Sequence, residues 1–518
     1  MENRIIHLQD IAGEHLKERM ESCFRMAAET RSIACIDPGV YTIVEPVGLV
    51  SGLKVEATGA VFRFPGKLGD AARVTMFRGE KIHDLHWHGG SFEGDVFDPE
   101  RPENPWQPNA ETVGILVSGG RDLSFRDIRG YHLAGPVVAL FGEETVPVRN
   151  VHVERLQCEL CGKFMWDYGY LWQRITFPDQ FSPAEVANAH ENMTWERMSG
   201  VLRFDGTKIL GDIPAATSPD GAVTFFGKQL PAGLTRGRYY YAEDIEGGIC
   251  IRETRDGAPL TFADSGEQVR LFRGIYEVYH AMYAPKNCGI SKGAVDLRFC
   301  EDVLVTDCQI SSSGDATHFD HCRRICVKSN QIHGGRMGAM FFAFGCEDVL
   351  CEGNIVDGGN GSRVLTVETG GTNVRIVGNV FQNGGRGTWI DTPQGLEIRG
   401  NVFLRNTGKC RQDPKLGRIS PTRGTFERYA EMYFTTRKCG ATYGDICIEG
   451  NVFDCADCTA AIALTAAGEN IRIAGNRMTG GGLYVSPECK NVTVEENAGQ
   501  LPLLQEIPLE AFDIPGRI

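Results

Sequence analysis

An asparagine recurs at a nearly constant interval through the second half of this 518-residue chain. It follows a glycine in three copies of Gly-Asn-Val-Phe, at Asn379, Asn401 and Asn451. Related turns carry further members of the series: Asn330, Asn354, Asn476 and Asn497. The successive steps are 24, 25, 22, 50, 25 and 21 residues, so the step of 50 is two periods or one period with an insertion. A unit this short cannot bury a core alone, whereas stacked units can.

A short strand with alternating apolar residues precedes most of these asparagines, as in Val374-Arg375-Ile376. Alternation with a period of two indicates a strand with one buried face. Asparagine suits the turn because it tolerates the left-handed backbone region and because stacked asparagine side chains can form a hydrogen-bonded ladder. A leucine-rich repeat has a similar period, but the leucine frame is missing. The sequence therefore predicts an all-β fold, a right-handed parallel β-helix.

The N-terminal residues predict a cap for this solenoid. Residues 9–30 have the apolar spacing of an amphipathic helix, and a strand containing Pro38-Gly39-Val40-Tyr41 follows. This order resembles the start of pectate-lyase-like β-helices, in which a helix covers the first coil. A cap is needed because a terminal coil exposes an apolar core and an unpaired strand edge.

The period breaks twice, which predicts two insertions. Residues 218–266, within the first break, resemble a small β module of phage virion proteins. The predicted organisation is a cap helix at 1–35, a first part of the β-helix at 36–165, an inserted β domain at 166–290, the main β-helix at 291–500 with an insertion at 405–444, and a tail at 501–518.

Composition and charge narrow the function. The chain has 53 Lys+Arg against 67 Asp+Glu, a net charge of −14, which argues against a nucleic-acid partner. No apolar run of membrane-spanning length occurs, so no membrane partner is expected. The N-terminus lacks the apolar region of a signal peptide, which predicts a cytoplasmic protein, or a secreted or periplasmic one if the chain has been trimmed. The 18 cysteines are expected to be reduced, buried thiols.

Three coils can be aligned on Cys300, Cys322 and Cys346. Counting back from each cysteine predicts one set of outward side chains and, at the opposite parity, an inward set that includes Phe341 and Ala343. The outward set is Asp296, Arg298, His318, Asp320, Phe342 and Phe344. Later coils add Glu368, Trp389 and Asp391 to the same face.

This combination of residue types is typical of a carbohydrate-binding or carbohydrate-cleaving site. Aromatic rings stack on pyranose faces, and two carboxyl groups supply the acid and the base of glycoside hydrolysis. We therefore expect His318 and Asp320 to bind sugar hydroxyl groups and Arg298 to be a further substrate-binding residue. The predicted stacking residues are Phe342, Phe344 and Trp389.

One run of residues resembles a specific family. Asp315-Ala316-Thr317-His318-Phe319, followed by Cys322 and Arg323, resembles a motif of glycoside hydrolase family 110, the inverting exo-α-1,3-galactosidases. The segment 368–381 resembles a second motif of that family. The resemblance implies that Asp315 and Glu368 are active-site carboxylates and that one of them, Asp315 or Glu368, activates water. Two coils separate them, about 10 Å along the axis, and inclined side chains could approach the roughly 6.5–9.5 Å of an inverting pair.

The chain departs from that family one coil later. Where the family has an Asp-Asp pair that holds the general acid, this sequence has Arg336-Met337-Gly338-Ala339. Asp296, Asp320 or Asp391 could supply the proton instead. Alternatively, the protein is a lyase or epimerase of uronic-acid glycans, with Arg336 pairing with an anionic sugar. A third alternative is a non-catalytic glycan-binding β-helix or a β-helix of the phage tailspike type.

The first of these hypotheses is preferred. The sequence predicts an inverting glycoside hydrolase that acts on α-galactoside-like ends of an oligo- or polysaccharide. Neither a cofactor nor a metal is required for that chemistry. A homo-oligomer, dimer or trimer, is left open.

Overall fold

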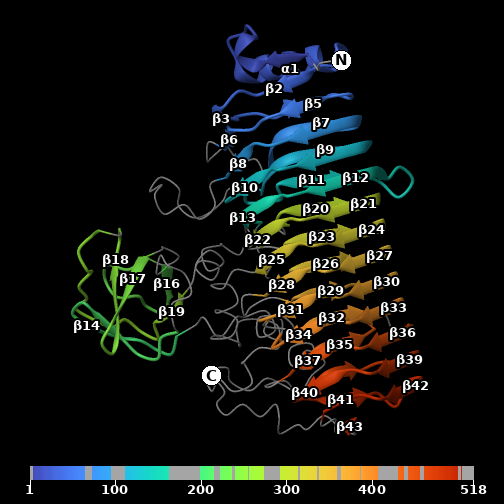
Figure 1. Cartoon of the computed structure of the whole chain (residues 1–518). Helices are drawn as coiled ribbons and strands as arrows, with labels where there is room; N and C mark the ends of the chain where they lie inside the picture. The colour runs from blue at the N-terminus through green and yellow to red at the C-terminus, as the bar shows by residue number, and fades with distance from the viewer. Residues whose placement is uncertain are drawn as a thin grey trace.

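The computed structural model describes residues 4–64, 73–94, 111–162, 199–214, 222–235, 240–254, 256–273, 292–312, 315–334, 338–358, 363–384, 387–406, 430–436, 441–455, 460–499 and 503–504. Most of these residues lie in short strands that stack in parallel from the N-terminus to the C-terminus (Figure 1). The predicted all-β, right-handed parallel β-helix is confirmed.

Each complete coil has three strands and therefore three faces. In one coil β20 (Val295–Arg298), β21 (Cys300–Thr306) and β22 (Gln309–Ser312) follow one another. Each pairs in parallel with its equivalent in the next coil, where β23, β24 and β25 take the same places. We call the stacks that contain β20, β21 and β22 the first, second and third faces.

The first face contains β4 (Val47–Gly48), β11 (Val138–Phe141), β20, β23 (Thr317–Asp320), β26 (Met340–Ala343), β29 (Leu365–Val367), β32 (Thr388–Asp391), β35 (Ala430–Thr435), β38 (Ala460–Leu464), β41 (Gly482–Val485) and β43 (Leu503–Leu504). The second face contains β1 (Ile5–His7), β2 (Ile33–Cys35), β5 (Lys54–Glu56), β12 (Val148–Glu154), β21, β24 (Arg323–Lys328), β27 (Glu347–Glu352), β30 (Thr372–Val377), β33 (Gln394–Arg399), β36 (Tyr443–Glu449), β39 (Gly468–Ala474) and β42 (Lys490–Glu495). Two long strands, β7 (Arg73–His88) and β9 (Glu111–Arg126), run through both faces.

The third face contains β3 (Gly39–Thr42), β6 (Ala60–Arg63), β8 (Ser91–Glu93), β10 (Arg129–Tyr131), β13 (Gln157–Cys161), β22, β25 (Gln331–Gly334), β28 (Ile355–Asp357), β31 (Val380–Gln382), β34 (Val402–Leu404), β37 (Val452–Asp454) and β40 (Arg477–Thr479). Most neighbouring strands keep one register, with shifts in the β13–β22 and β38–β41 pairs, so equivalent residues of successive coils form rows along the axis.

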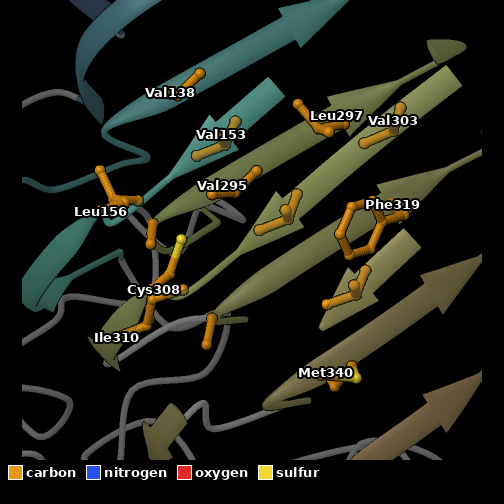
Figure 2. Packing of buried hydrophobic residues seen from close by; sticks show 14 of the residues in the cluster. Val138, Val153, Leu156, Val295, Leu297, Val303, Cys308, Ile310, Phe319 and Met340 are labelled. Atoms are coloured by element: carbon orange, nitrogen blue, oxygen red, sulfur yellow. The ribbon is translucent and has the colours of Figure 1, made fainter. Parts of the chain in front are cut away.

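Inward rows form one continuous hydrophobic core. Figure 2 shows Leu297, Phe319 and Met340, which come from three successive coils, in this shared interior. Rings also stack in register: Phe381, Phe403 and Phe453 have centroids 5.1 and 5.0 Å apart. Stacking of this kind lets a short repeat bury its apolar side chains against its two neighbours.

The recurring asparagines form a buried ladder at the turn before the third face. The Nδ2 of each one donates to the Oδ1 of the next, at 2.9 Å from Asn330 to Asn354 and at 3.0 Å from Asn401 to Asn451. Asn401 and Asn451 are thus neighbours, so the step of 50 residues is one coil with an insertion. β35, inside the segment 405–444, continues the first face.

The backbone explanation for these asparagines was wrong. The residue with positive φ is the one before each asparagine, for example Gly378 at 65° and Ser329 at 57°. The preceding residue, usually a glycine, adopts the left-handed conformation, and the asparagine is needed for its side-chain hydrogen bonds.

A helix, α1 (Leu16–Glu29), covers the N-terminal end of the solenoid (Figure 1). It begins later than the predicted residue 9, because Leu8–Asp10 forms the 3-10 turn η1. Its buried Phe24 packs against Phe77 and Trp87 of the first coils, with ring centroids 6.3 and 6.4 Å away. No helix in the described part of the chain is both long enough and apolar enough to cross a membrane.

A separate antiparallel sheet lies within the segment 166–290. Its strands are β14 (Arg203–Asp205), β15 (Lys208–Leu210), β18 (Gly248–Arg252), β17 (Tyr240–Ile245), β16 (Ala222–Phe226) and β19 (Arg270–Arg273), in that order. The N–H of Ser199 donates to Leu271 and the N–H of Leu202 to Val269, so the chain before β14 closes on β19. The module has its own hydrophobic core, built around Phe204 and Phe225.

All fourteen cysteines in the described residues are free. Cys300, Cys322 and Cys346 are fully buried in one row, and burial raises the pKa of the thiols of Cys300 and Cys346 well above the ordinary value. They act as small apolar side chains in the core.

Candidate functional site

Two rows of outward side chains run along the first face. We call the row of Asp296 the first row and the row of Arg298 the second row. The first row continues through His318, Phe341, Thr366, Trp389 and Tyr433. The second row continues through Asp320 and Ala343, and Glu368, Asp391 and Thr435 follow in the next coils.

A compact cluster of Asp296, Arg298 and His318 joins the two rows. His318 Nδ1 lies 2.9 Å from Asp296 Oδ1, and Arg298 donates to Asp296 Oδ2 at 3.0 Å. The register creates these contacts because Asp296 faces His318 across the β20–β23 pair. The guanidinium group of Arg298 also lies over the ring of Phe141, 4.8 Å from its centroid. The cluster is held on three sides and cannot easily reorient.

The Asp296 carboxylate is ionised despite its burial. It is only 1% exposed, and burial alone would raise its pKa. The hydrogen bond and charge of His318, together with Arg298, outweigh burial and lower the pKa below the usual value. An ionised carboxylate with both oxygens paired is a poor proton donor, so Asp296 is better suited to orienting His318 than to acting as an acid.

His318 is 3% exposed, and its contact with Asp296 uses only Nδ1 of the two ring nitrogens. None of the described residues hydrogen-bonds to its Nε2. The imidazole contacts the Phe341 ring, with centroids 5.3 Å apart. A histidine fixed by a carboxylate at Nδ1 can bind or exchange a proton at Nε2.

Asp315 lies where the chain enters β23 and forms a buried ion pair. Lys292 Nζ is 2.6 Å from Asp315 Oδ2 and 5.5 Å from the centroid of Phe341. The other oxygen, Oδ1, is buried without a hydrogen-bond partner. Only one of the two carboxylate oxygens of Asp315 therefore pairs with Lys292.

Asp320 and Glu368 occupy the second row on either side of Ala343. Asp320 faces Ala343 across β23 and β26, and the N–H of Glu368 donates to the carbonyl of Phe342 at 2.7 Å, which continues the ladder. Two coils separate them, about 10 Å between Cα atoms. The Asp320 side chain is 17% exposed and contacts His321. Because Ala343 is small, the space between the two carboxyl groups stays open, and their separation is compatible with that of an inverting pair.

Asp391 is one coil beyond Glu368, about 5 Å along the axis. Its Oδ1 accepts a hydrogen bond from Thr392 Oγ1 at 2.8 Å, and the residue is buried. Glu368 and Asp391 follow the paired residues Val367 and Ile390, so they lie at equivalent places of adjacent coils.

The predicted orientations of Phe341 and Phe342 were wrong: the two residues point in the opposite directions to those expected. Phe342 points inward, is 0% exposed and stacks on Phe319, whereas Phe341 lies in the first row. The cause is one extra turn residue. Asp320 and Cys322 are separated by His321 alone, but Ala343 and Cys346 are separated by Phe344 and Gly345. Counting back from the cysteines therefore shifted β26 by one place.

The other two predicted stacking residues also differ from expectation. Phe344 belongs to the turn, not to the sheet; it is 44% exposed and stacks on His321 with centroids 5.8 Å apart. Trp389 has the predicted outward parity but is only 4% exposed, in a cluster with Ala430 and Tyr433. Neither residue therefore presents an exposed aromatic ring on the sheet surface on which a sugar could stack.

The expected approach of Asp315 to Glu368 does not occur. Asp315 is five residues before Asp320, so it lies about 16 Å from the second row along the strand direction, besides the two coils that separate it from Glu368. Asp315, His318 and Asp296 share one part of the face, and Asp320 and Glu368 share another. Arg336 lies outside the described residues.

Sequence analysis missed Lys292 and Phe341, which complete the surroundings of Asp315 and His318. Lys292 stands 23 residues before Asp315, one period of the repeat, so the spacing could have indicated the contact. Phe341 was missed only through the shift in register.

Comparison with known proteins agrees with this architecture. The class defined by the fold is the right-handed parallel β-helix, and the family model described as "Right handed beta helix region" matches residues 278–412. No curated protein sequence matches the chain significantly.

Several solved structures are similar in fold. The surface adhesin PfbA of Streptococcus pneumoniae is 9% identical, with 95% of this chain and 91% of that chain covered at a TM-score of 0.46. The tailspike of Escherichia coli bacteriophage HK620, in complex with a hexasaccharide, is 9% identical, with 95% and 65% covered at 0.45. The A-module of the Azotobacter vinelandii mannuronan C-5 epimerase AlgE6 is 10% identical, with 95% and 99% covered at 0.41. At this level of similarity none of them says what this chain binds or converts.

Proposed function

We propose that the first face is a glycan site and that the protein hydrolyses a glycosidic bond there. The observation that supports this proposal most directly is the pairing of an oriented imidazole with carboxyl groups on one face: His318 is hydrogen-bonded to buried Asp296 beside Asp320. A glycan lying along the axis would meet Asp296 and Arg298 at one coil, His318 at the next coil and Glu368 two coils beyond His318. Its class would be an oligo- or polysaccharide.

Asp320 and Glu368 would carry the reaction. The resemblance to glycoside hydrolase family 110 implies that Glu368 activates water, which leaves Asp320 to protonate the leaving-group oxygen. Their separation of about 10 Å between Cα atoms allows a carboxyl distance of roughly 6.5–9.5 Å, enough for a water molecule and an inverting displacement. The anomeric carbon would lie over Ala343.

His318 would bind a sugar hydroxyl group through Nε2, with Asp296 and Arg298 holding the imidazole in place. The α-galactoside-like terminus is the substrate implied by the same family resemblance. No step of this reaction uses a cofactor.

The test separates the two carboxyl roles. Glycans with α- and β-linked ends, and nitrophenyl glycosides of the sugar that is released, would be incubated with wild-type protein, Asp320→Asn and Glu368→Gln. A leaving group that needs no protonation should restore activity to Asp320→Asn but not to Glu368→Gln. Asp302→Asn, a surface carboxylate paired with Arg324, is the control. Equal loss in both variants on every substrate would refute the assignment.

A second candidate is a lyase or epimerase of uronic-acid glycans. The observation that favours it is the oriented His318, a suitable base: Arg298 pairs with its partner Asp296, and Lys292 lies over the Phe341 ring that His318 contacts. Incubation with uronic-acid polymers decides between the two reactions. Elimination produces ultraviolet absorbance from an unsaturated uronate, whereas hydrolysis produces reducing ends without it. Binding without any product would support a third candidate, a glycan-binding β-helix.

A further inference from the structure

Three side chains with metal-binding atoms converge at the N-terminal end of the solenoid, on the second face and far from the candidate glycan site. They are His7 at the end of β1, Cys35 at the end of β2 and Asp37 just beyond it. One ligand atom from each lies within 4.8 Å of the other two. All three are partly accessible, with neither the full burial of core residues nor the full exposure of surface chains.

Strand pairing brings these residues together. His7 and Cys35 are partners in the parallel β1–β2 pair, and both point outward because the neighbouring Ile6 and Ala34 are buried. Asp37 follows on the same side, with Oδ1 2.8 Å from His7 Nδ1. The arrangement belongs to the backbone register and does not depend on a flexible loop.

A second layer of hydrogen bonds fixes Asp37. Its Oδ2 accepts from the N–H of Gln9 at 3.0 Å, and the hydroxyl of Tyr41 donates to its carbonyl at 2.7 Å. Outer contacts of this kind orient ligands before a metal arrives. The surrounding charge also favours a cation, because Glu56 is the partner of Cys35 in the next strand.

We propose that His7, Cys35 and Asp37 form a site for a divalent cation of the zinc class. A thiolate, an imidazole and a carboxylate together suit Zn²⁺ or Co²⁺, whereas Mg²⁺ and Ca²⁺ prefer oxygen ligands alone. Tetrahedral coordination at about 2.0–2.3 Å places ligand atoms about 3.3–3.7 Å apart. The His7 Nδ1–Asp37 Oδ1 distance of 2.8 Å would therefore lengthen slightly, and a separation at the 4.8 Å limit would shorten by about 1 Å. Water fills the fourth position.

Binding releases one proton. A cysteine thiol ordinarily holds its proton at neutral pH. The metal takes the sulfur as thiolate and the proton goes to solvent, so affinity rises with pH. The bound ion would connect β1 to β2 and so attach the N-terminal strand and the cap that follows it to the first coil.

Cobalt provides the direct test. Co²⁺ added to the full, reduced chain should produce visible ligand-field bands and a near-ultraviolet thiolate-to-cobalt band, and Zn²⁺ should remove both. Cys35→Ser should abolish the thiolate band, and His7→Ala should weaken binding at least tenfold. Cys326→Ser is the matched control, since Cys326 is a partly accessible, outward thiol on β24 of the same face. Absence of the bands from the wild-type protein, or their survival in Cys35→Ser, would overturn the site.

A measurement on the wild-type chain keeps the test valid if a variant fails to fold. Alkylation of Cys35 and Cys326 would be followed by mass spectrometry with and without Zn²⁺. The ion should slow modification of Cys35 at least tenfold and leave Cys326 unchanged. Equal effects on the two thiols, or none, would refute the proposal.

Discussion

Asp296 and His318 are hydrogen-bonded across two coils, with 2.9 Å between Oδ1 and Nδ1, although both side chains point away from the hydrophobic core. Outward residues of a solenoid are usually solvated, yet these two are almost completely buried. The pair is thus an oriented unit built into the first face, and it invites direct experiments.

Replacing Asp296 with Asn should weaken glycan binding by about 10–100-fold, because the amide no longer holds the imidazole of His318 in the same orientation. Turnover at saturating glycan should change less than binding. Initial rates and glycan affinity measured on the same preparation check this, with Asp302→Asn as the control for loss of a surface carboxylate. Unchanged glycan affinity would remove His318 from the proposed site.

Acid should destabilise the protein partly through Asp296. Its pKa in the folded chain is lowered, so its contribution to stability is present above the unfolded pKa of about 3.9 and is lost as the pH falls through the lower, folded value. Asp296→Asn should therefore show a flatter dependence of Tm on pH below about pH 4. Thermal unfolding followed by circular dichroism would measure it, and Asp348→Asn reports the effect of losing one surface charge. Parallel curves for wild type and Asp296→Asn would contradict the expectation.

The product of hydrolysis should have inverted anomeric configuration. Asp320 and Glu368 are two coils apart, and this spacing suits an inverting pair. Glu368 and Asp391 are one coil apart, close to the roughly 5–5.5 Å of a retaining pair. Proton NMR of the first product formed distinguishes the outcomes. Retention would move the reaction to Glu368 and Asp391.

Removing one member of the asparagine ladder should cost about 2–4 kcal/mol of unfolding free energy. Asn330→Ala deprives the backbone N–H of Cys308 of its acceptor at 2.9 Å and the carbonyl of Val305 of its donor at 3.1 Å. Its neighbour Gln331 is exposed, so Gln331→Ala should change stability by less than about 0.5 kcal/mol. Denaturant unfolding of both variants tests the contrast. Similar values for the two would show that the ladder is dispensable.

The fold was predictable because each repeat can be recognised from short sequence patterns. The asparagine spacing, the alternating strands and the Gly-Asn turns each report on only a few neighbouring residues, and together they define a stacked coil. The amide ladder could be expected for the same reason. The role of the left-handed position could not, since Gly378 and Asn379 are adjacent and sequence alone does not say which of the two adopts it.

The site was harder to predict because it depends on register between coils. Asp296 and His318 were placed correctly since the two turns before Cys300 and Cys322 have equal lengths. Phe342 was misplaced by the single extra residue at Phe344-Gly345. The expected closeness of Asp315 and Glu368 failed for another reason: counting coils gives distance along the axis but not the position along a strand.

That extra turn residue has a consequence for how such a protein can change its specificity. Lengthening a corner by one residue exchanges which of Phe341 and Phe342 faces outward, while the asparagine ladder continues undisturbed from Asn330 to Asn354. Insertions and deletions at the turns between strands can thus change the outward side chains of one coil at a time. Each coil can therefore vary by itself while the asparagine ladder keeps the stack in register, so the outward side chains can be changed unit by unit.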